Sequence, residues 1–295
     1  MTSAVGIVTP EGLETSGADP GGVYQIGSVT KVFTALLLAQ EVVGGRLTME
    51  TRVGALLPVL DERPVGGVTL GALVTHTSGL PRLPPGMWRK AFGPARRNPY
   101  ADIDEPTLYA AVGAITPRPR SRLVYSNLGF GLLGSALARH LRTSYDEAVR
   151  KRIAAPLGMG QTRSHPDAHQ PGHNKRGRLR PQVWTFDALA GCGALWSSVD
   201  DLALFVRANL EPPEGELGAA IRLTQEPLVK SARTEQAMAW IKLSGKDGEL
   251  LFHNGGTAGY RSFVGVDTGR QRGVVVLSDS DRSVDREGFR LVREG

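Results

Sequence analysis

Sequence typical of β-strands lies at both ends of this 295-residue chain, and helix-forming sequence fills the middle. Residues 4–8 and 13–16 flank the turn sequence Pro10-Glu11-Gly12 and predict an N-terminal hairpin. Toward the C-terminus, strands separated by glycine turns at 245–248, 255–256 and 268–273 are expected at residues 237–243, 249–253, 260–267 and 273–278.

The simplest way to bury these strands is one antiparallel sheet built from both chain ends. We therefore expect an α+β fold (an α/β sandwich) in which helices flank the sheet and a mainly helical region is inserted. Residues of about 1–60 and 235–295 would form the α/β part, and about 61–234 the helical insertion. The whole chain, 1–295, would be a single domain.

The strongest apolar segment follows a short predicted strand at 23–26. Ser28 is a good helix-starting residue, and Gly44-Gly45 is a good helix stop. Residues 28–43 are apolar nearly all round, which predicts a buried helix at the seam between the two parts. Further helices are expected at 69–74, 107–114, 128–141, 145–155, 202–209 and 283–293.

The composition, 41% hydrophobic and 22% charged, is that of a globular protein, and no apolar run is long enough to span a membrane. The N-terminus has no signal-peptide pattern, so the chain as written is expected in the cytoplasm, or exported if its N-terminus is incomplete. The net charge of +6 comes from arginine clusters in Pro- and Gly-rich loops, which favours solvated charge over nucleic-acid binding. The oligomeric state stays open.

Ser28 and Lys31 are three residues apart at the start of the buried helix, so Lys31 would stand one turn above Ser28. A hydroxyl with an amine beside it and free backbone N–H donors around it is what an acyl-transfer nucleophile needs. The alternative is that Ser28 only caps the helix.

Two further motifs carry polar side chains at element boundaries. Tyr125-Ser126-Asn127 directly precedes a helix, and Asn127 taken alone would be a helix cap. His253-Asn254-Gly255-Gly256 follows a predicted strand and taken alone would be a glycine turn. Its glycines would also let a substrate approach the strand edge closely.

In this order, Ser-x-x-Lys, Tyr-x-Asn and His-x-Gly resemble the motifs of the serine β-lactamase and penicillin-binding protein superfamily. The similar branch is that of class C β-lactamases, D,D-peptidases and family VIII esterases. Four other stretches also resemble that branch, namely residues 25–31, 73–80, 155–159 and 193–198. The resemblance runs over nearly the whole chain.

The resemblance implies that Ser28 forms an acyl-enzyme, and that Lys31 and Tyr125 move its proton. Which of these two is the general base stays open. It also implies that Asn127 orients Lys31 and holds the substrate, and that the backbone N–H groups of Ser28 and Gly256 form the oxyanion hole.

His253, with Gly255 after it, takes the place of the lysine in the Lys-Thr-Gly motif of β-lactamases. A histidine holds a substrate carboxylate less well than a permanent cation. The resemblance therefore favours an esterase or D,D-peptidase-like hydrolase over an efficient β-lactamase, acting on ester, amide or β-lactam substrates, small molecules or peptides, without a cofactor. The alternative is a non-catalytic penicillin-binding-like protein that binds peptide or peptidoglycan-like ligands.

Other polar residues are interpreted as structural. Prolines interrupt the segment that holds His165, His169 and His173, so no metal site is expected there. His76 is expected to be structural, and Cys192, the only cysteine, a small buried filler. The loops at 81–103 and 159–187 are expected to decide the substrate.

Overall fold

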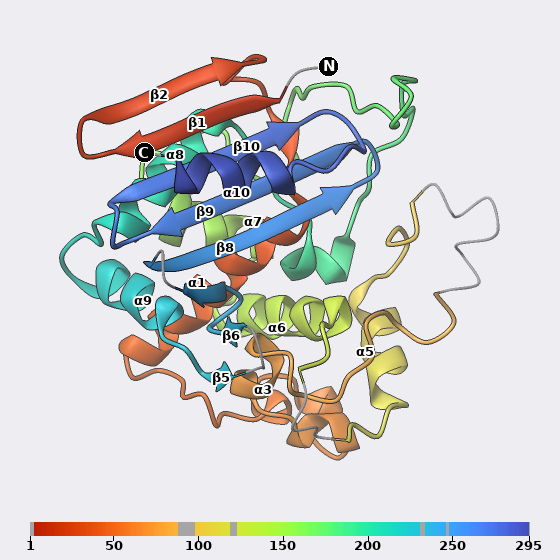
Figure 1. Cartoon of the computed structure of the whole chain (residues 1–295). Helices are drawn as coiled ribbons and strands as arrows, with labels where there is room; N and C mark the ends of the chain where they lie inside the picture. Colours follow the sequence, from red (N-terminus) through yellow and green to blue (C-terminus); the bar gives the residue numbers. More distant parts are fainter. Residues whose placement is uncertain (1–2, 88–97, 119–122, 231–233, 246–247, 295) are drawn as a thin grey trace.

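The computed structural model describes residues 3–87, 98–118, 123–230, 234–245 and 248–294. Its centre is an eight-stranded antiparallel sheet in the order β2-β1-β10-β9-β8-β7-β6-β5 (Figure 1). The strands are β1 (Ala4–Thr9), β2 (Gly12–Gly17), β5 (Val229–Lys230), β6 (Glu235–Gln236), β7 (Ile241–Gly245), β8 (Gly248–Thr257), β9 (Tyr260–Asp267) and β10 (Arg272–Ser278).

The first and last strands of the chain are neighbours in this sheet, because Ala4 to Val8 of β1 pair with Leu277 to Gly273 of β10. The predicted α+β fold, with one sheet made from both chain ends, is confirmed. A separate two-stranded ribbon pairs β3 (Tyr24–Gln25) with β4 (Trp196–Ser197).

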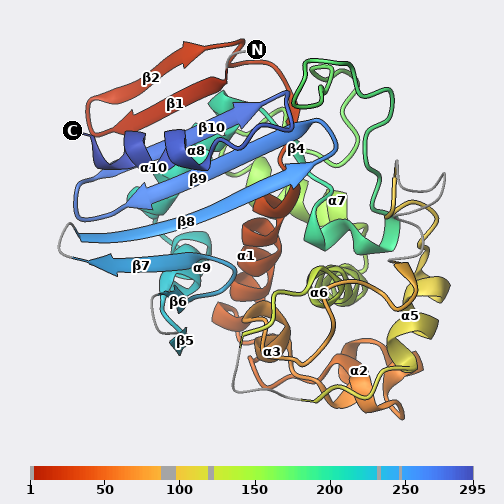
Figure 2. The same ribbon diagram turned by 45° about the vertical axis from the view of Figure 1, so that its right-hand side comes forward.

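Helices cover both faces of the sheet and form a helical region beside it (Figure 2). The α-helices are α1 (Thr30–Val43), α2 (Val53–Leu56), α3 (Leu70–Val74), α5 (Glu105–Gly113), α6 (Asn127–His140), α7 (Tyr145–Val149), α8 (Val199–Leu210), α9 (Glu216–Gln225) and α10 (Asp285–Arg293). Short 3₁₀ turns are η1 (Gly27–Val29), η2 (Pro58–Leu60), η3 (Pro64–Gly67) and η6 (Asp187–Cys192), and η5 (Arg150–Ala154) is a π turn. None of the described helices is long and apolar enough to cross a membrane.

The two faces of the sheet bury different clusters of side chains. α10 covers one face, where Phe263, Val274 and Val276 pack with Val292. The other face belongs to the main core, which includes α1, α6 and α8. α8 therefore packs on the sheet although it lies within 61–234, so the inserted region also contributes to the α/β part.

α1 is the buried helix that the sequence predicts, and every side chain from Thr30 to Glu41 is buried. Its start differs from the prediction. Ser28 lies in η1, one turn before α1, and its side chain makes no capping hydrogen bond. Since the hydroxyl is not used as a cap, it is available to its neighbours in the cleft described below.

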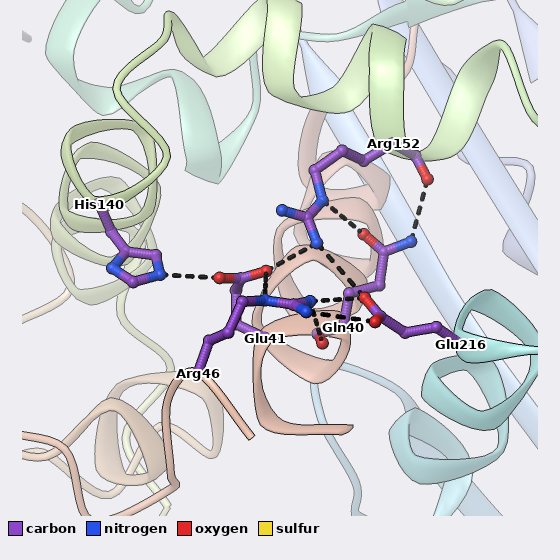
Figure 3. A network of polar contacts seen from close by, with 6 residues as sticks. All are labelled: Gln40, Glu41, Arg46, His140, Arg152 and Glu216. Carbon is purple, nitrogen blue, oxygen red and sulfur yellow. Dashed lines mark hydrogen bonds and ion pairs between the residues drawn. The ribbon is translucent and has the colours of Figure 1, made fainter. Parts of the chain in front are cut away.

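Glu41 fixes the far end of α1 through a network of charged side chains (Figure 3). Its buried carboxylate contacts Arg46 at 2.9 Å, Arg152 at 2.6 Å and His140 at 2.7 Å. Both arginines also reach Glu216 on α9. Burial alone would raise the pKa of Glu41, but the His140 hydrogen bond and the two arginine charges outweigh it and hold the pKa below its usual value. The network therefore joins α1 to α6, η5 and α9.

Two predictions near the C-terminus are wrong in detail. Gly255 and Gly256 lie inside β8 and are not a turn; the turn to β9 is at Ala258-Gly259. Residues 237–240 are a buried connection between β6 and β7. Helix α9 is not among the helices expected from the sequence.

Candidate active site

A cavity of about 960 Å³ lies where η1, the start of α6 and β8 meet. Its lining includes Ser28, Tyr125, His253, Gly255 and Gly256, all of which are candidate site residues from the sequence. The other two selected residues, Lys31 and Asn127, are buried directly behind it. The structure thus brings together all seven candidate residues, which come from three distant segments of the chain.

Lys31 and Tyr125 converge on the hydroxyl of Ser28. Lys31 Nζ donates to Ser28 Oγ at 3.1 Å, as the three-residue spacing predicts, and Tyr125 Oη donates to the same oxygen at 2.7 Å. Lys31 Nζ also donates to Asn127 Oδ1 at 2.9 Å and to the carbonyl oxygen of Cys192 at 2.7 Å. Since an ammonium has three N–H bonds, these contacts use every donor of Lys31.

Asn127 accepts from Lys31 and is itself held by a second hydrogen bond. Its amide nitrogen donates to the hydroxyl of Tyr100 at 2.8 Å, and burial raises the pKa of Tyr100, which keeps that hydroxyl protonated. Asn127 is not the helix cap that it would be if taken alone. Ser126 caps α6, because its Oγ accepts the N–H of Gly129 at 2.8 Å.

His76 packs behind Tyr125, with their ring centres 4.6 Å apart. Its Nδ1 accepts the backbone N–H of Ser126 at 3.0 Å. Burial, followed by the positive charge of Lys31, lowers the pKa of His76 well below its usual value, so the ring is neutral and able to accept. His76 therefore positions Tyr125, a role that its sequence motif alone does not reveal.

The backbone of η1 packs directly against β8. A Cβ atom on Gly255 would lie 2.1 Å from Ile26 O and 2.9 Å from Ser28 N, and one on Gly27 would lie 2.8 Å from Gly256 N. Side chains are thus excluded at this crossing, and the amide nitrogens of Ser28 and Gly256 occupy adjacent positions. β7 pairs with β8 only as far as Phe252, so the η1 side of this part of β8 carries no neighbouring strand.

The model of the beta-lactamase family matches residues 11–295 of this chain. The chain belongs to the beta-lactamase family.

Several solved structures have the same fold at low sequence identity. The beta-lactamase/D-alanine carboxypeptidase of Pseudomonas syringae aligns with a TM-score of 0.87 at 20% identity, covering 100% of this chain and 94% of that one. A class C beta-lactamase of Rhodobacter sphaeroides aligns with a TM-score of 0.82 at 22% identity, covering 95% and 90%.

Among curated proteins, penicillin-binding protein 4 of Amycolatopsis lactamdurans is 34% identical over 148 residues, which are 49% of this chain and 37% of the relative. AmpH of Escherichia coli K12, a D-alanyl-D-alanine-carboxypeptidase/endopeptidase, is 31% identical over 156 residues, 50% and 38% of the two chains. Protein flp of Staphylococcus aureus is 23% identical over 277 residues, 89% and 54%. The chain thus spans between about a third and about half of the length of these relatives.

Within the family's cleft, His253 carries no charge. It is buried, and its Nδ1 lies 2.7 Å from the carbonyl oxygen of Asn254. Burial, helped by the charge of Lys31, lowers the pKa of His253 to about 3. At neutral pH it therefore supplies no cation for a substrate carboxylate.

His169 and His173 make other contacts, and the thiol of Cys192 is not a second nucleophile. His173 contacts Asp279 at 3.2 Å, and the ring of His169 packs on Trp196. No three acidic, histidine or cysteine side chains of the described residues are grouped as metal ligands. Burial raises the pKa of Cys192 to about 11, so its thiol is unreactive, but its carbonyl oxygen is an acceptor for Lys31 that no side-chain motif could reveal.

Proposed function

We propose that this protein is a serine hydrolase that forms an acyl-enzyme at Ser28, with small-molecule or peptide esters, amides or β-lactams as substrates. The observation that carries the proposal is the convergence of Lys31 and Tyr125 on Ser28 Oγ, at 3.1 and 2.7 Å. A free serine hydroxyl is a poor nucleophile and needs a base within hydrogen-bonding distance. Here two such groups contact it from different elements.

In acylation, the Lys31–Tyr125 pair takes the proton of Ser28 as Oγ bonds to the substrate's carbonyl carbon. Both neighbours donate to Oγ in the resting site, so one of them must enter the reaction in its basic form. The adjacent backbone N–H groups of Ser28 and Gly256 would stabilise the oxyanion, and a donor of this kind contributes about 3–4 kcal/mol to a transition state. The proton then passes to the leaving group as its bond to carbon breaks.

Deacylation uses the same groups with water as the nucleophile. The pair accepts a proton from water as the hydroxyl oxygen attacks the acyl carbon, and it returns a proton to Ser28 as the ester bond breaks. Asn127 keeps Lys31 directed at Ser28 in both steps, because its carbonyl oxygen holds Nζ at 2.9 Å.

We further propose that the activity is of the esterase or D,D-peptidase type and not that of an efficient β-lactamase. The support is that His253 is buried and neutral, with a pKa of about 3. In the β-lactamases that this chain resembles, a lysine occupies that position of the motif. A neutral imidazole provides no charge–charge attraction for a substrate carboxylate, and His-x-Gly resembles the motif of the peptidase and esterase branches of the superfamily.

The test is intact-protein mass after incubation with a fluorescent penicillin and, separately, with a p-nitrophenyl ester. Rapid ester turnover with a slow or absent penicillin adduct, both lost in Ser28→Ala, is the expected result. A long-lived penicillin adduct at Ser28 would indicate a peptidase-like protein, and fast penicillin turnover a β-lactamase. A folded protein that gives neither adduct nor turnover would overturn the catalytic proposal in favour of a binding relative.

A further inference from the structure

We infer that Arg82 is the residue with which this cleft selects substrates that carry a carboxylate. The inference rests on the proposed serine hydrolase function and adds a substrate class to it. Arg82 follows the stretch at 73–80 but belongs to none of the three motifs, and it lines the cavity together with Ser28 and Tyr125.

The guanidinium of Arg82 lies over the face of the Tyr125 ring, with its central carbon 4.9 Å from the ring centre. This is a cation–π arrangement, in which the attraction to the ring uses none of the N–H hydrogen-bond donors of the guanidinium. Because Tyr125 Oη contacts Ser28 Oγ, a carboxylate bound by Arg82 would sit beside the reacting atoms.

The backbone of Arg82 is firmly held. Its carbonyl oxygen accepts the N–H groups of Asn127 at 3.0 Å and Leu128 at 3.2 Å, at the start of α6. The carbonyl oxygen of the preceding residue, Pro81, accepts the hydroxyl of Ser126 at 2.7 Å. Arg82 is thereby fixed to the same turn that presents Tyr125.

The other basic residues in and behind the cleft either interact with other protein groups or are neutral. Arg180 contacts Asp281 at 2.6 Å. Arg261 contacts the same carboxylate at 3.4 Å and donates to two backbone carbonyls. Lys31 has used its three donors, and His253 is neutral.

Arg82 differs from these residues in its contacts. It is exposed, and no acidic side chain of the described residues forms an ion pair with it. The remaining acid of the cleft, Asp285, accepts hydrogen bonds from Asn254 and Ser283. Among the arginines that line the described part of the cavity, Arg82 is therefore the one whose guanidinium has no carboxylate partner.

The test compares substrates whose charge is removed by methylation. One pair is p-nitrophenyl hydrogen glutarate and its methyl ester, which places the carboxylate on the acyl side. The other is 4-acetoxybenzoate and its methyl ester, which places it on the leaving group. For each pair the ratio of kcat/KM, anionic over neutral, is measured in the wild type, Arg82→Gln and Arg82→Lys.

We expect one of the two pairs to show a preference for the anion that falls roughly tenfold in Arg82→Gln, since a hydrogen-bonded ion pair contributes about that much in a partly open site. Arg82→Lys should restore part of it, and added NaCl should weaken it in the wild type. The matched control is Arg63→Gln, which removes the same charge from an exposed arginine on the wall of a different cavity and should leave both ratios unchanged.

Equal losses of kcat/KM for anionic and neutral esters in Arg82→Gln would overturn the inference and indicate that Arg82 only supports Tyr125. The proposed hydrolase function fails differently, by absent turnover of every ester in the wild type. In that event calorimetric binding of the intact glutarate ester and its methyl ester to Ser28→Ala, with and without Arg82→Gln, decides the role of Arg82. Anion-selective binding that Arg82→Gln removes would support it, and binding that is equal in both variants would refute it.

Discussion

Replacing Gly255 by alanine tests whether the direct contact between η1 and β8 creates the oxyanion site. The added Cβ would meet the backbone oxygen of Ile26 at 2.1 Å, Ser262 Oγ at 2.5 Å and Ser28 N at 2.9 Å. Real Cβ atoms essentially never come closer than 3.0 Å to such neighbours, so η1 and β8 must separate by about 1 Å. The backbone cannot rotate away as a flexible side chain would, and Ile26 O also accepts the Ser262 hydroxyl at 2.7 Å.

A displacement of about 1 Å at a reacting centre costs roughly 100-fold in rate, and loss of one oxyanion donor costs about 100- to 1,000-fold. We therefore expect kcat on a p-nitrophenyl ester to fall at least about 100-fold in Gly255→Ala, with an overpacking cost of about 1–3 kcal/mol in unfolding free energy. Gly256→Ala should be milder, since the nearest atoms to its Cβ belong to the flexible Arg261 side chain, at 3.0–3.2 Å. Gly160→Ala, with nothing within 4 Å, is the matched control.

The assay combines burst and steady-state kinetics with a thermal melt of each variant, so that lost activity in a folded protein is distinguished from lost folding. Wild-type kcat in a folded Gly255→Ala would refute the reasoning. It would mean that η1 and β8 tolerate separation, and that the oxyanion is not held between them.

Three further expectations follow from single contacts. Tyr125→Phe removes the 2.7 Å donor to Ser28 and should lower kcat by roughly 100- to 10,000-fold without a change in Tm; a normal kcat would exclude Tyr125 from proton transfer. Glu41→Gln breaks a buried network of three ionic partners and should lower the free energy of unfolding by about 3–5 kcal/mol, measured by denaturant titration. Glu147→Gln breaks an exposed ion pair and should change the denaturation midpoint little. Equal midpoints for the two variants would contradict this expectation. The pKa of His253 is about 3 in the folded protein and near 6.5 in the unfolded chain, so below pH 6.5 the unfolded chain binds a proton that the folded protein does not. The free energy of unfolding therefore decreases as the pH falls below about 6.5, by about 2 kcal/mol at pH 5. That part of the pH dependence should be missing in His253→Gln, and an unchanged pH slope would show that the buried imidazole becomes protonated in the native state.

The parts of the site that sequence predicts are those fixed by local geometry. Lys31 reaches Ser28 because a three-residue spacing on a helical turn brings two side chains together, whatever the rest of the fold does. Tyr125 and Asn127 were selected by a motif, and their meeting with Lys31 depends on how α6 packs against α1. The cap at Ser126 was missed because serine and asparagine are equally good caps, and only the backbone decides between adjacent candidates.

The parts that sequence misses depend on long-range contacts. A pair of glycines is as typical of a turn as of a close backbone crossing, so the sequence predicts a turn at Gly255 and Gly256, although they lie inside β8. Arg82 belongs to none of the sequence motifs. Its inferred role depends on the observation that Arg180 and Arg261 form ion pairs with Asp281. The expected specificity loop at 81–103 is described only at 81–87 and 98–103, so the prediction for its centre, including the arginines at 96 and 97, lies outside the described residues.

The polar groups on α1 explain how a nearly all-apolar helix holds Ser28, which directly precedes it, at a fixed position in the cleft. Apolar packing is non-directional, so it resists sliding and rotation of a helix less strictly than hydrogen bonds do. Thr30 accepts the N–H of Leu195 at 3.1 Å, Lys31 donates to Cys192 O at 2.7 Å, and Thr34 donates to Gly191 O at 2.7 Å. These bonds all lead to one segment, 191–195, which therefore sets the position of α1 along its own axis. Since the same ammonium group makes one of these bonds and contacts Ser28, a shift of this segment would move Lys31 and Ser28 together, and the geometry between them would be preserved.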